Sequence, residues 1–204
     1  MIRRLLFVLA VAVSTPLAAQ QFAFELWHEG KLVLESSDTL RGYIKYDLQN
    51  DLLQYKSGSK LASFTARKAV FFEIYDNTVK RYRQFYSLPY SNSSQYKTPV
   101  FFEILTEGKI TLLAREKLEY RTYSSPFNYY GGYSTRLVLV YKYFLLRDNG
   151  NIEDFSGKKS DWIDVMGERA DDVTKYAKQN KLDFDEKYDL TRIIDYYNSF
   201  FVKK

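Results

Sequence analysis

Two glutamates hold the same place in a repeated five-residue motif, and they are the first candidates for catalysis. The motif Val-Phe-Phe-Glu-Ile occurs at residues 70–74 and again at 100–104, which gives Glu73 and Glu103. On neighbouring strands, the two carboxylates could face one cleft. Glycoside hydrolysis uses such a pair, one carboxyl group as the acid and the other as the base or nucleophile. The simpler interpretation places each glutamate on the solvent face of its strand, because alternation alone explains both positions.

Other catalytic chemistry has few candidate residues. The chain has no cysteine, and His28 is its only histidine, so a Ser-His-Asp arrangement would have to use it. His28 falls in an expected hairpin turn, where we expect an exposed imidazole without a catalytic role. Zinc sites depend on His and Cys, and the acidic residues at 148–154 lack the spacing of a calcium loop. We therefore predict no metal site and no cofactor.

Cations and aromatic residues alternate at Arg81, Tyr82 and Arg83, which makes this segment a candidate binding surface. On a strand, Arg81 and Arg83 share one face and Tyr82 lies on the other. Such a surface could bind anionic glycans or lipid headgroups through charge and stacking. The alternative is a solvated edge strand whose cations oppose aggregation.

A tyrosine-rich and glycine-rich loop at 124–134 is the second candidate binding surface. Exposed tyrosines supply rigid, amphipathic contact area to a partner. The alternatives are a mobile loop and a loop that folds back over a sheet edge. The aromatic residues of this loop are Phe127, Tyr129, Tyr130 and Tyr133.

The elements that position these residues are mostly strands. Short segments of alternating apolar and polar residues, separated by turn residues, follow one another from 22 to 155. The two repeated motifs should be interior strands, and Asn149-Gly150 predicts a tight hairpin turn between the last two strands. We predict a mainly antiparallel β-domain, whose sheet is either a curved sheet, an open barrel or a sandwich.

From residue 158 onward the apolar residues repeat at helical rather than strand spacing. Trp162 to Met166 predict a short helix, Ala170 to Ala177 a second, and Leu190 to Phe201 a third with a single apolar stripe. These helices should pack on the sheet. The predicted fold class is therefore α+β, with a β-domain over 20–157 and a helical segment of three helices over 158–204.

Residues 1–19 have the layout of a secretory signal peptide. Arg3 and Arg4 precede a short apolar run, and Ala18-Ala19 supply small residues for cleavage before Gln20. The apolar run is too short to span a membrane, so we expect no transmembrane span after signal removal. Because no cysteine follows the small residues, we expect no lipid anchor on a cysteine at this terminus. We predict an exported protein, in the periplasm or outside the cell.

The charge balance argues against nucleic acid as a partner. The formal net charge of +5 falls to +3 once Arg3 and Arg4 are removed with the signal peptide. This excess is too small for a protein whose task is phosphate binding, and export places the chain away from nucleic acid.

The two ends of the chain resemble small bacterial exported proteins of unassigned function. The resemblance rests on Asn180-Lys181-Leu182-Asp183 and Ile193 to Asn198 near the C-terminus, and on Gly42 to Asp47 near the N-terminus. It implies a location in the cell envelope and no particular activity. The leading hypothesis is a non-enzymatic binding module for an envelope protein or glycan. The alternatives are a saccharide hydrolase and a purely structural envelope component.

Overall fold

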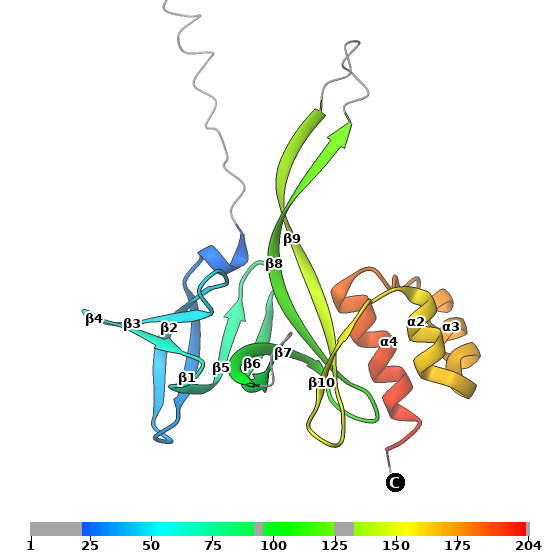
Figure 1. Cartoon of the computed structure of the whole chain (residues 1–204), viewed down its shortest axis with the longest axis horizontal. Helices are drawn as coiled ribbons and strands as arrows, with labels where there is room; N and C mark the ends of the chain where they lie inside the picture. The colour runs from blue at the N-terminus through cyan, green and yellow to red at the C-terminus, as the bar shows by residue number, and fades with distance from the viewer. Residues whose placement is uncertain (1–21, 92–95, 125–132, 203–204) are drawn as a thin grey trace, which may run out of the picture.

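The computed structural model describes residues 22–91, 96–124 and 133–202. In this part of the chain ten strands form one open antiparallel sheet, in the spatial order β10-β9-β8-β7-β6-β5-β1-β2-β3-β4 (Figure 1). The strands are β1 (His28–Leu34), β2 (Thr39–Asp47), β3 (Leu52–Ser57), β4 (Lys60–Thr65), β5 (Ala69–Asp76), β6 (Arg81–Tyr90), β7 (Thr98–Thr106), β8 (Thr111–Ser124), β9 (Tyr133–Leu146) and β10 (Ile152–Phe155).

The helical segment follows the sheet in the chain and packs at one end of it (Figure 1). The α-helices are α2 (Lys159–Met166), α3 (Ala170–Gln179) and α4 (Lys187–Ser199); the 3-10 turns are η1 (Ala23–Glu25) and η2 (Gly167–Arg169). The η2 turn joins α2 directly to α3, with a bend at Gly167, whose φ is 53°. The first two predicted helices therefore form one bent helical run, and α4 forms a second. No helix in these ranges is long and apolar enough to cross a membrane.

The α+β class and the dominance of antiparallel strands are confirmed, and of the expected forms the structure has an open sheet rather than a barrel or a sandwich. The strands lie in a single sheet with β10 and β4 at its two ends, so within the described ranges no strand pairing closes it into a barrel. The sheet curls strongly enough for Tyr46 of β2 to pack edge-to-face on Phe101 of β7, with ring centroids 5.8 Å apart. The two repeated motifs lie in β5 and β7, which are interior strands as predicted. They are not neighbours, because β6 lies between them.

Strand register defines the two faces of the sheet. Directly paired residues of antiparallel strands point to the same face. We call the face that carries the following row the inner face, and the opposite face the outer face. The row crosses five strands as Phe72, Phe85, Glu103, Ala114 and Tyr143.

Two separate hydrophobic cores lie on the inner face. The N-terminal core is rich in aromatic rings, with Phe72 and Phe85 stacked at 4.3 Å between ring centroids. The C-terminal core places Leu112 and Ala114 of β8 against the helices, where Trp162 and Leu190 are fully buried. A smaller cluster of Phe102, Leu113 and Phe144 covers the outer face of β7, β8 and β9. Interior strand β7 is therefore buried on both of its faces.

Most of the β8–β9 hairpin extends beyond the sheet. The two strands pair with each other from Thr111/Leu146 to Ser124/Tyr133, whereas β8 pairs with β7 only at residues 112–114 and β9 with β10 only at residues 143–146. The remainder projects from the body as a two-stranded ribbon (Figure 1). We call residues 117–124 and 133–140 the arm.

Candidate functional site

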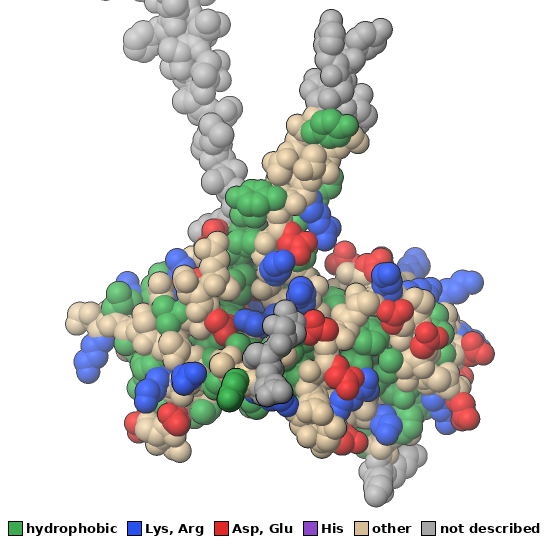
Figure 2. Space-filling view, in the orientation of Figure 1, with side chains coloured by type: hydrophobic (Ala, Val, Ile, Leu, Met, Phe, Trp, Pro, Cys, Tyr) green, Lys and Arg blue, Asp and Glu red, His purple; other side chains and the backbone are tan. Residues whose placement is uncertain are grey.

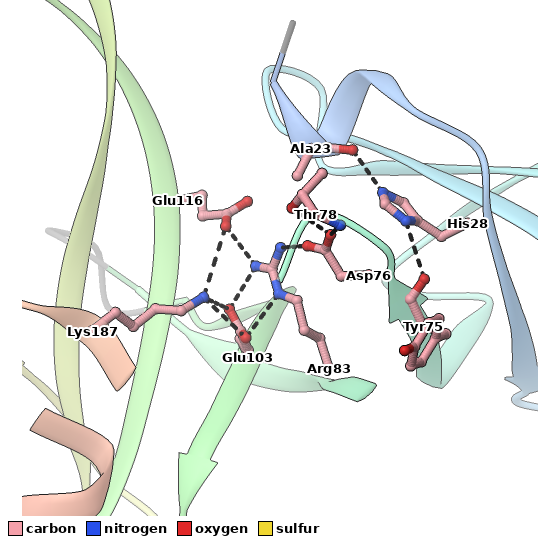
Figure 3. Close-up of polar contacts among 9 residues, drawn as sticks. All are labelled: Ala23, His28, Tyr75, Asp76, Thr78, Arg83, Glu103, Glu116 and Lys187. Atoms are coloured by element: carbon pink, nitrogen blue, oxygen red, sulfur yellow. Dashed lines mark hydrogen bonds and ion pairs between the residues drawn. The ribbon is translucent and has the colours of Figure 1, made fainter. Parts of the chain in front are cut away.

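A cluster of buried charged side chains lies between the two inner-face cores (Figure 3). Arg83 is at its centre and donates from Nε to Glu103 Oε1 at 2.9 Å and from Nη2 to Glu103 Oε2 at 2.7 Å. The same guanidinium donates to Asp76 Oδ2 at 3.1 Å and to Glu116 Oε1 at 2.5 Å. Lys187, the first residue of α4, donates to both oxygens of Glu103, at 3.1 and 2.9 Å.

The side chains of the cluster are almost completely shielded from solvent, and the charges around Glu103 determine its protonation state. The five side chains are between 1% and 4% exposed. Burial by itself would raise the pKa of Glu103, but the charges of Arg83 and Lys187 outweigh burial and lower that pKa to about 2. Burial is also the main reason that the pKa of Lys187 is lowered. Glu103 is therefore ionised throughout the physiological pH range and cannot act as a general acid.

The chemistry of this cluster is structural. It joins the end of β5, three further strands and the start of α4 through charge-assisted hydrogen bonds, which are among the strongest polar contacts in proteins. The oxygens of Glu103 are all occupied by donors from this chain. The cluster therefore fixes α4 on the sheet and leaves Glu103 without capacity for a substrate.

The two glutamates of the hydrolase hypothesis are not brought together. Glu73 pairs in register with Gln84, whereas the next residue of β6, Phe85, pairs with Glu103. Adjacent residues of a strand point to opposite faces, so Glu73 lies on the outer face and Glu103 on the inner face. The expectation of a solvent-exposed Glu103 is also wrong, since this residue is 3% exposed.

The side chains of the cationic segment of β6 alternate between the two faces of the sheet, as predicted, but only some of them are accessible to solvent. Tyr82 lies on the outer face and is 67% exposed, whereas Arg83 is buried in the charged cluster. The guanidinium of Arg81 lies 3.9 Å from the ring centroid of Tyr188 in α4. Arg83 is therefore not a surface contact residue. The edge-strand alternative is wrong as well, because β6 lies between β5 and β7.

The only histidine also differs from expectation. His28 lies in β1 rather than in a turn and is 2% exposed. Its Nε2 lies 2.7 Å from the carbonyl oxygen of Ala23, and its Nδ1 lies 3.2 Å from that of Tyr75 (Figure 3). These contacts hold the η1 turn against β5. The sequence could not show that His28 holds this turn in place, because the contact depends on where the fold puts the backbone carbonyl of Ala23.

The arm carries the described part of the tyrosine loop. Tyr133 is the first residue of β9 and is 80% exposed, whereas Phe127, Tyr129 and Tyr130 lie outside the described residues. The register places only uncharged side chains on the inner-face side of the arm. These are Leu118, Tyr120, Thr122, Ser124, Tyr133, Thr135, Leu137 and Leu139.

All charged residues of the arm lie on its other side. Lys117, Arg121 and Arg136 provide three cations against the single carboxylate of Glu119. Hydrophobic and cationic side chains are visible along the arm, beyond the body of the molecule (Figure 2). Neither arm strand has a second strand neighbour in the described ranges, so both of its backbone edges are open.

No protein-family model matches this chain, and neither the curated proteins nor the solved structures include a significant match. The site must therefore be interpreted from its own geometry. Across the described ranges, no group of three or more His, Cys, Asp or Glu side chains is arranged to hold a metal ion.

Proposed function

We propose that this chain is an exported, non-enzymatic interaction module that binds a protein partner through the arm. The observation that carries the proposal is the segregation of charge on a projecting ribbon. Leu118, Leu137 and Leu139 lie on a side of the arm that has no charged residue. An isolated two-stranded ribbon is at best marginally stable in water, and exposed apolar surface commonly marks an interaction site.

The chemistry of the arm favours an extended strand of the partner as its occupant. Leu137 to Val140 are four consecutive aliphatic residues in a strand with an open edge. Long apolar edges promote strand pairing, and a partner strand can add to such an edge through main-chain hydrogen bonds. The flanking cations Arg136 and Lys142 favour a partner strand with acidic side chains near its ends.

Charge argues against a second copy of this chain as the occupant. An antiparallel pairing of two β9 strands centred on Leu139 would place Arg136 of each copy opposite Lys142 of the other. The pairing would therefore contain two such contacts between like charges. Like charges directly opposite each other on paired strands are destabilising. An acidic partner strand replaces both repulsions with attraction.

Export is the second part of the proposal. The order of cations, apolar run and small residues in 1–19 supports a signal peptide, although these residues lie outside the described part of the chain. The mature protein would then act in the periplasm or outside the cell. Sequencing the N-terminus of the protein recovered from its source tests this point. A terminus at Gln20 is expected, and retention of Met1 on the exported fraction would contradict it.

Site-specific crosslinking tests the arm. A photoreactive phenylalanine analogue at Leu139 should give one defined adduct in source cells, and the same analogue at Asp171, exposed on α3, should not. The partner from that adduct, once purified, should bind the wild-type chain and bind Leu139→Asp at least about tenfold more weakly, the effect of losing one buried anchor. Equal binding by the variant would reject the arm. An adduct of twice the chain's own mass would identify self-association instead.

A further inference from the structure

A hollow on the outer face of the sheet, away from the arm, has the chemistry of a ligand site. It has a volume of about 550 Å³ and lies over β1, β2, β5 and β6. Small-molecule sites commonly fall between roughly 300 and 1,000 Å³. Four strands in a row span about 14 Å from the first axis to the last, which is longer than a single sugar ring.

Aromatic rings form the apolar part of the hollow. Tyr43 is 53% exposed and Tyr82 is 67% exposed, so both present ring surface to solvent. Tyr75 packs edge-to-face against Tyr82, with ring centroids 5.1 Å apart, and supports its orientation. A large aromatic ring that is held in place by a neighbour offers stacking area at low entropic cost.

The polar part of the hollow contains both occupied and available groups. Glu73 is held by Lys31, whose Nζ lies 3.0 Å from its Oε1, and by Gln84, which donates to its Oε2 at 2.7 Å. Lys31 and Gln84 also lower the pKa of Glu73 against the opposing effect of burial, so the carboxylate is ionised. By contrast, the side chains of Glu29 and Arg41 form no hydrogen bond or ion pair within the described ranges.

The balance of charge selects the ligand class. Two cations, Lys31 and Arg41, face two carboxylates, Glu29 and Glu73. A site with this balance offers no net attraction to a phosphate or to an acidic polymer. A sugar ring has an apolar face of C–H groups and a rim of hydroxyls that both donate and accept. Tyrosine rings suit the face, and a carboxylate with a guanidinium suits the rim.

We propose that the hollow binds a short, uncharged oligosaccharide. Tyr43 and Tyr82 stack on its sugar rings, Glu29 accepts hydrogen bonds from its hydroxyls, and Arg41 donates to them. The site is independent of the arm, so the module would have a protein-binding surface and a saccharide-binding surface on different parts of the sheet.

The test uses three uncharged hexasaccharides as probes: β-1,4-linked glucose, α-1,4-linked glucose and β-1,4-linked N-acetylglucosamine. Titration calorimetry on the chain lacking residues 1–19 should detect binding of at least one probe at concentrations up to about 10 mM. Tyr82→Ala should weaken that binding about three- to tenfold, the effect of one lost aromatic contact. Arg41→Met should weaken it as well. Tyr120→Ala changes a similarly exposed tyrosine on the arm; it is the matched control and should bind like the wild type.

Three outcomes would overturn the proposal. The first is that none of the three probes produces heat in the calorimeter or chemical-shift changes in NMR spectra of the chain. The second is binding that neither Tyr82→Ala nor Tyr43→Ala weakens. The third is tighter binding of an α-1,4-linked galacturonate hexamer, which would show that the hollow selects acidic chains. Thermal unfolding of each variant checks folding. Both tyrosines are exposed, so their removal should lower the unfolding temperature only slightly, in Tyr82→Ala through the lost contact with Tyr75. Failure here leaves the arm's partner binding intact, since the arm lies elsewhere.

Discussion

Arg83 and Glu103 form a two-point ion pair between adjacent strands, with Nε–Oε1 and Nη2–Oε2 distances of 2.9 and 2.7 Å. The pair is buried, and Lys187 approaches the same carboxylate from α4. The middle of the sheet therefore depends on charges that water cannot compensate if one partner is lost. The removal of one partner from such a buried pair is far more damaging than the loss of an exposed ion pair.

Replacement of Arg83 should strongly destabilise the fold. Arg83→Met removes the cation that Asp76, Glu103 and Glu116 share. Within the described ranges Lys187 pairs with two of these carboxylates and not with Asp76, so we expect a loss of about 3–5 kcal/mol in the free energy of unfolding. Arg81→Met is the control, because Arg81 lies two residues away and loses only its contact with Tyr188, about 0.5–1 kcal/mol. Urea unfolding measures both. Similar losses for the two variants would show that the cluster is not a stabilising unit.

The stability of the fold should fall in acid. Because the pKa of Glu103 is lowered to about 2 in the folded chain, its contribution is complete above its usual pKa and is lost as the pH falls toward 2. The free energy of unfolding should fall by about 3 kcal/mol, because each unit by which the pKa of Glu103 is lowered on folding corresponds to about 1.36 kcal/mol. Urea unfolding between neutral pH and pH 2 should show this loss.

Glu103→Gln identifies the source of that acid sensitivity. The variant should start less stable at neutral pH and decline less steeply below pH 4.5 than the wild type, since residue 103 no longer titrates. A residual slope should remain, because the pKa of Asp76 is also lowered by its contacts with Thr78 and Arg83, against the effect of burial. Parallel acid curves for the two proteins would assign the sensitivity to other carboxyl groups.

Arm substitutions should change association without changing the stability of the body. Leu139→Lys interrupts the aliphatic run of β9, and a charge on an open strand edge opposes edge-to-edge pairing. We expect weaker binding of the partner identified by crosslinking and a change in unfolding free energy within about 0.5 kcal/mol, as for other surface positions. Thr135→Lys, on the same side of the strand, adds the same charge at a polar position. Equal effects from both variants would assign the change to net charge alone.

Asn198 should be needed for the docking of α4. Its Oδ1 accepts from the backbone N–H of Ile110, and its Nδ2 donates to the carbonyl oxygen of Ile110, both at 2.8 Å. Asn198→Leu leaves both buried backbone groups without partners, which should cost about 2–6 kcal/mol at about 1–3 kcal/mol for each group.

Ser199→Ala is the matched control for this position. It removes an exposed hydroxyl one residue further along α4, which donates a hydrogen bond to the carbonyl oxygen of Tyr196. Its expected cost is within about 1 kcal/mol. Hydrogen exchange of the α4 amides should accelerate in Asn198→Leu alone. Unchanged protection in that variant would show that Asn198 does not hold the helix.

The strands and helices were largely predictable, because alternation and helical spacing are local properties. The placement of Glu103 was not. In β5 the second phenylalanine of the motif faces inward and Glu73 faces outward, whereas in β7 Glu103 itself faces inward. The same five residues therefore turn opposite sides toward the inner face in the two strands. Because β7 is covered on both faces, its apolar pattern does not indicate which face carries the glutamate.

The binding surfaces were predictable only in part. Tyr82 and Tyr133 are exposed as expected, but the hollow around Tyr43 and the neutral side of the arm depend on cross-strand register. Pairing between distant segments is not encoded in any single window of the sequence. Arg83 was placed on the surface for the same reason: its carboxylate partners come from β5, β7 and β8.

The position of Lys187 has a consequence for the order of folding during biosynthesis. The second cation of the central cluster arrives only with the last helix, so a nascent chain that ends before it holds an excess of negative charge in the middle of its future sheet. The middle of the sheet should therefore reach its full stability only after Lys187 has been synthesised and α4 has docked.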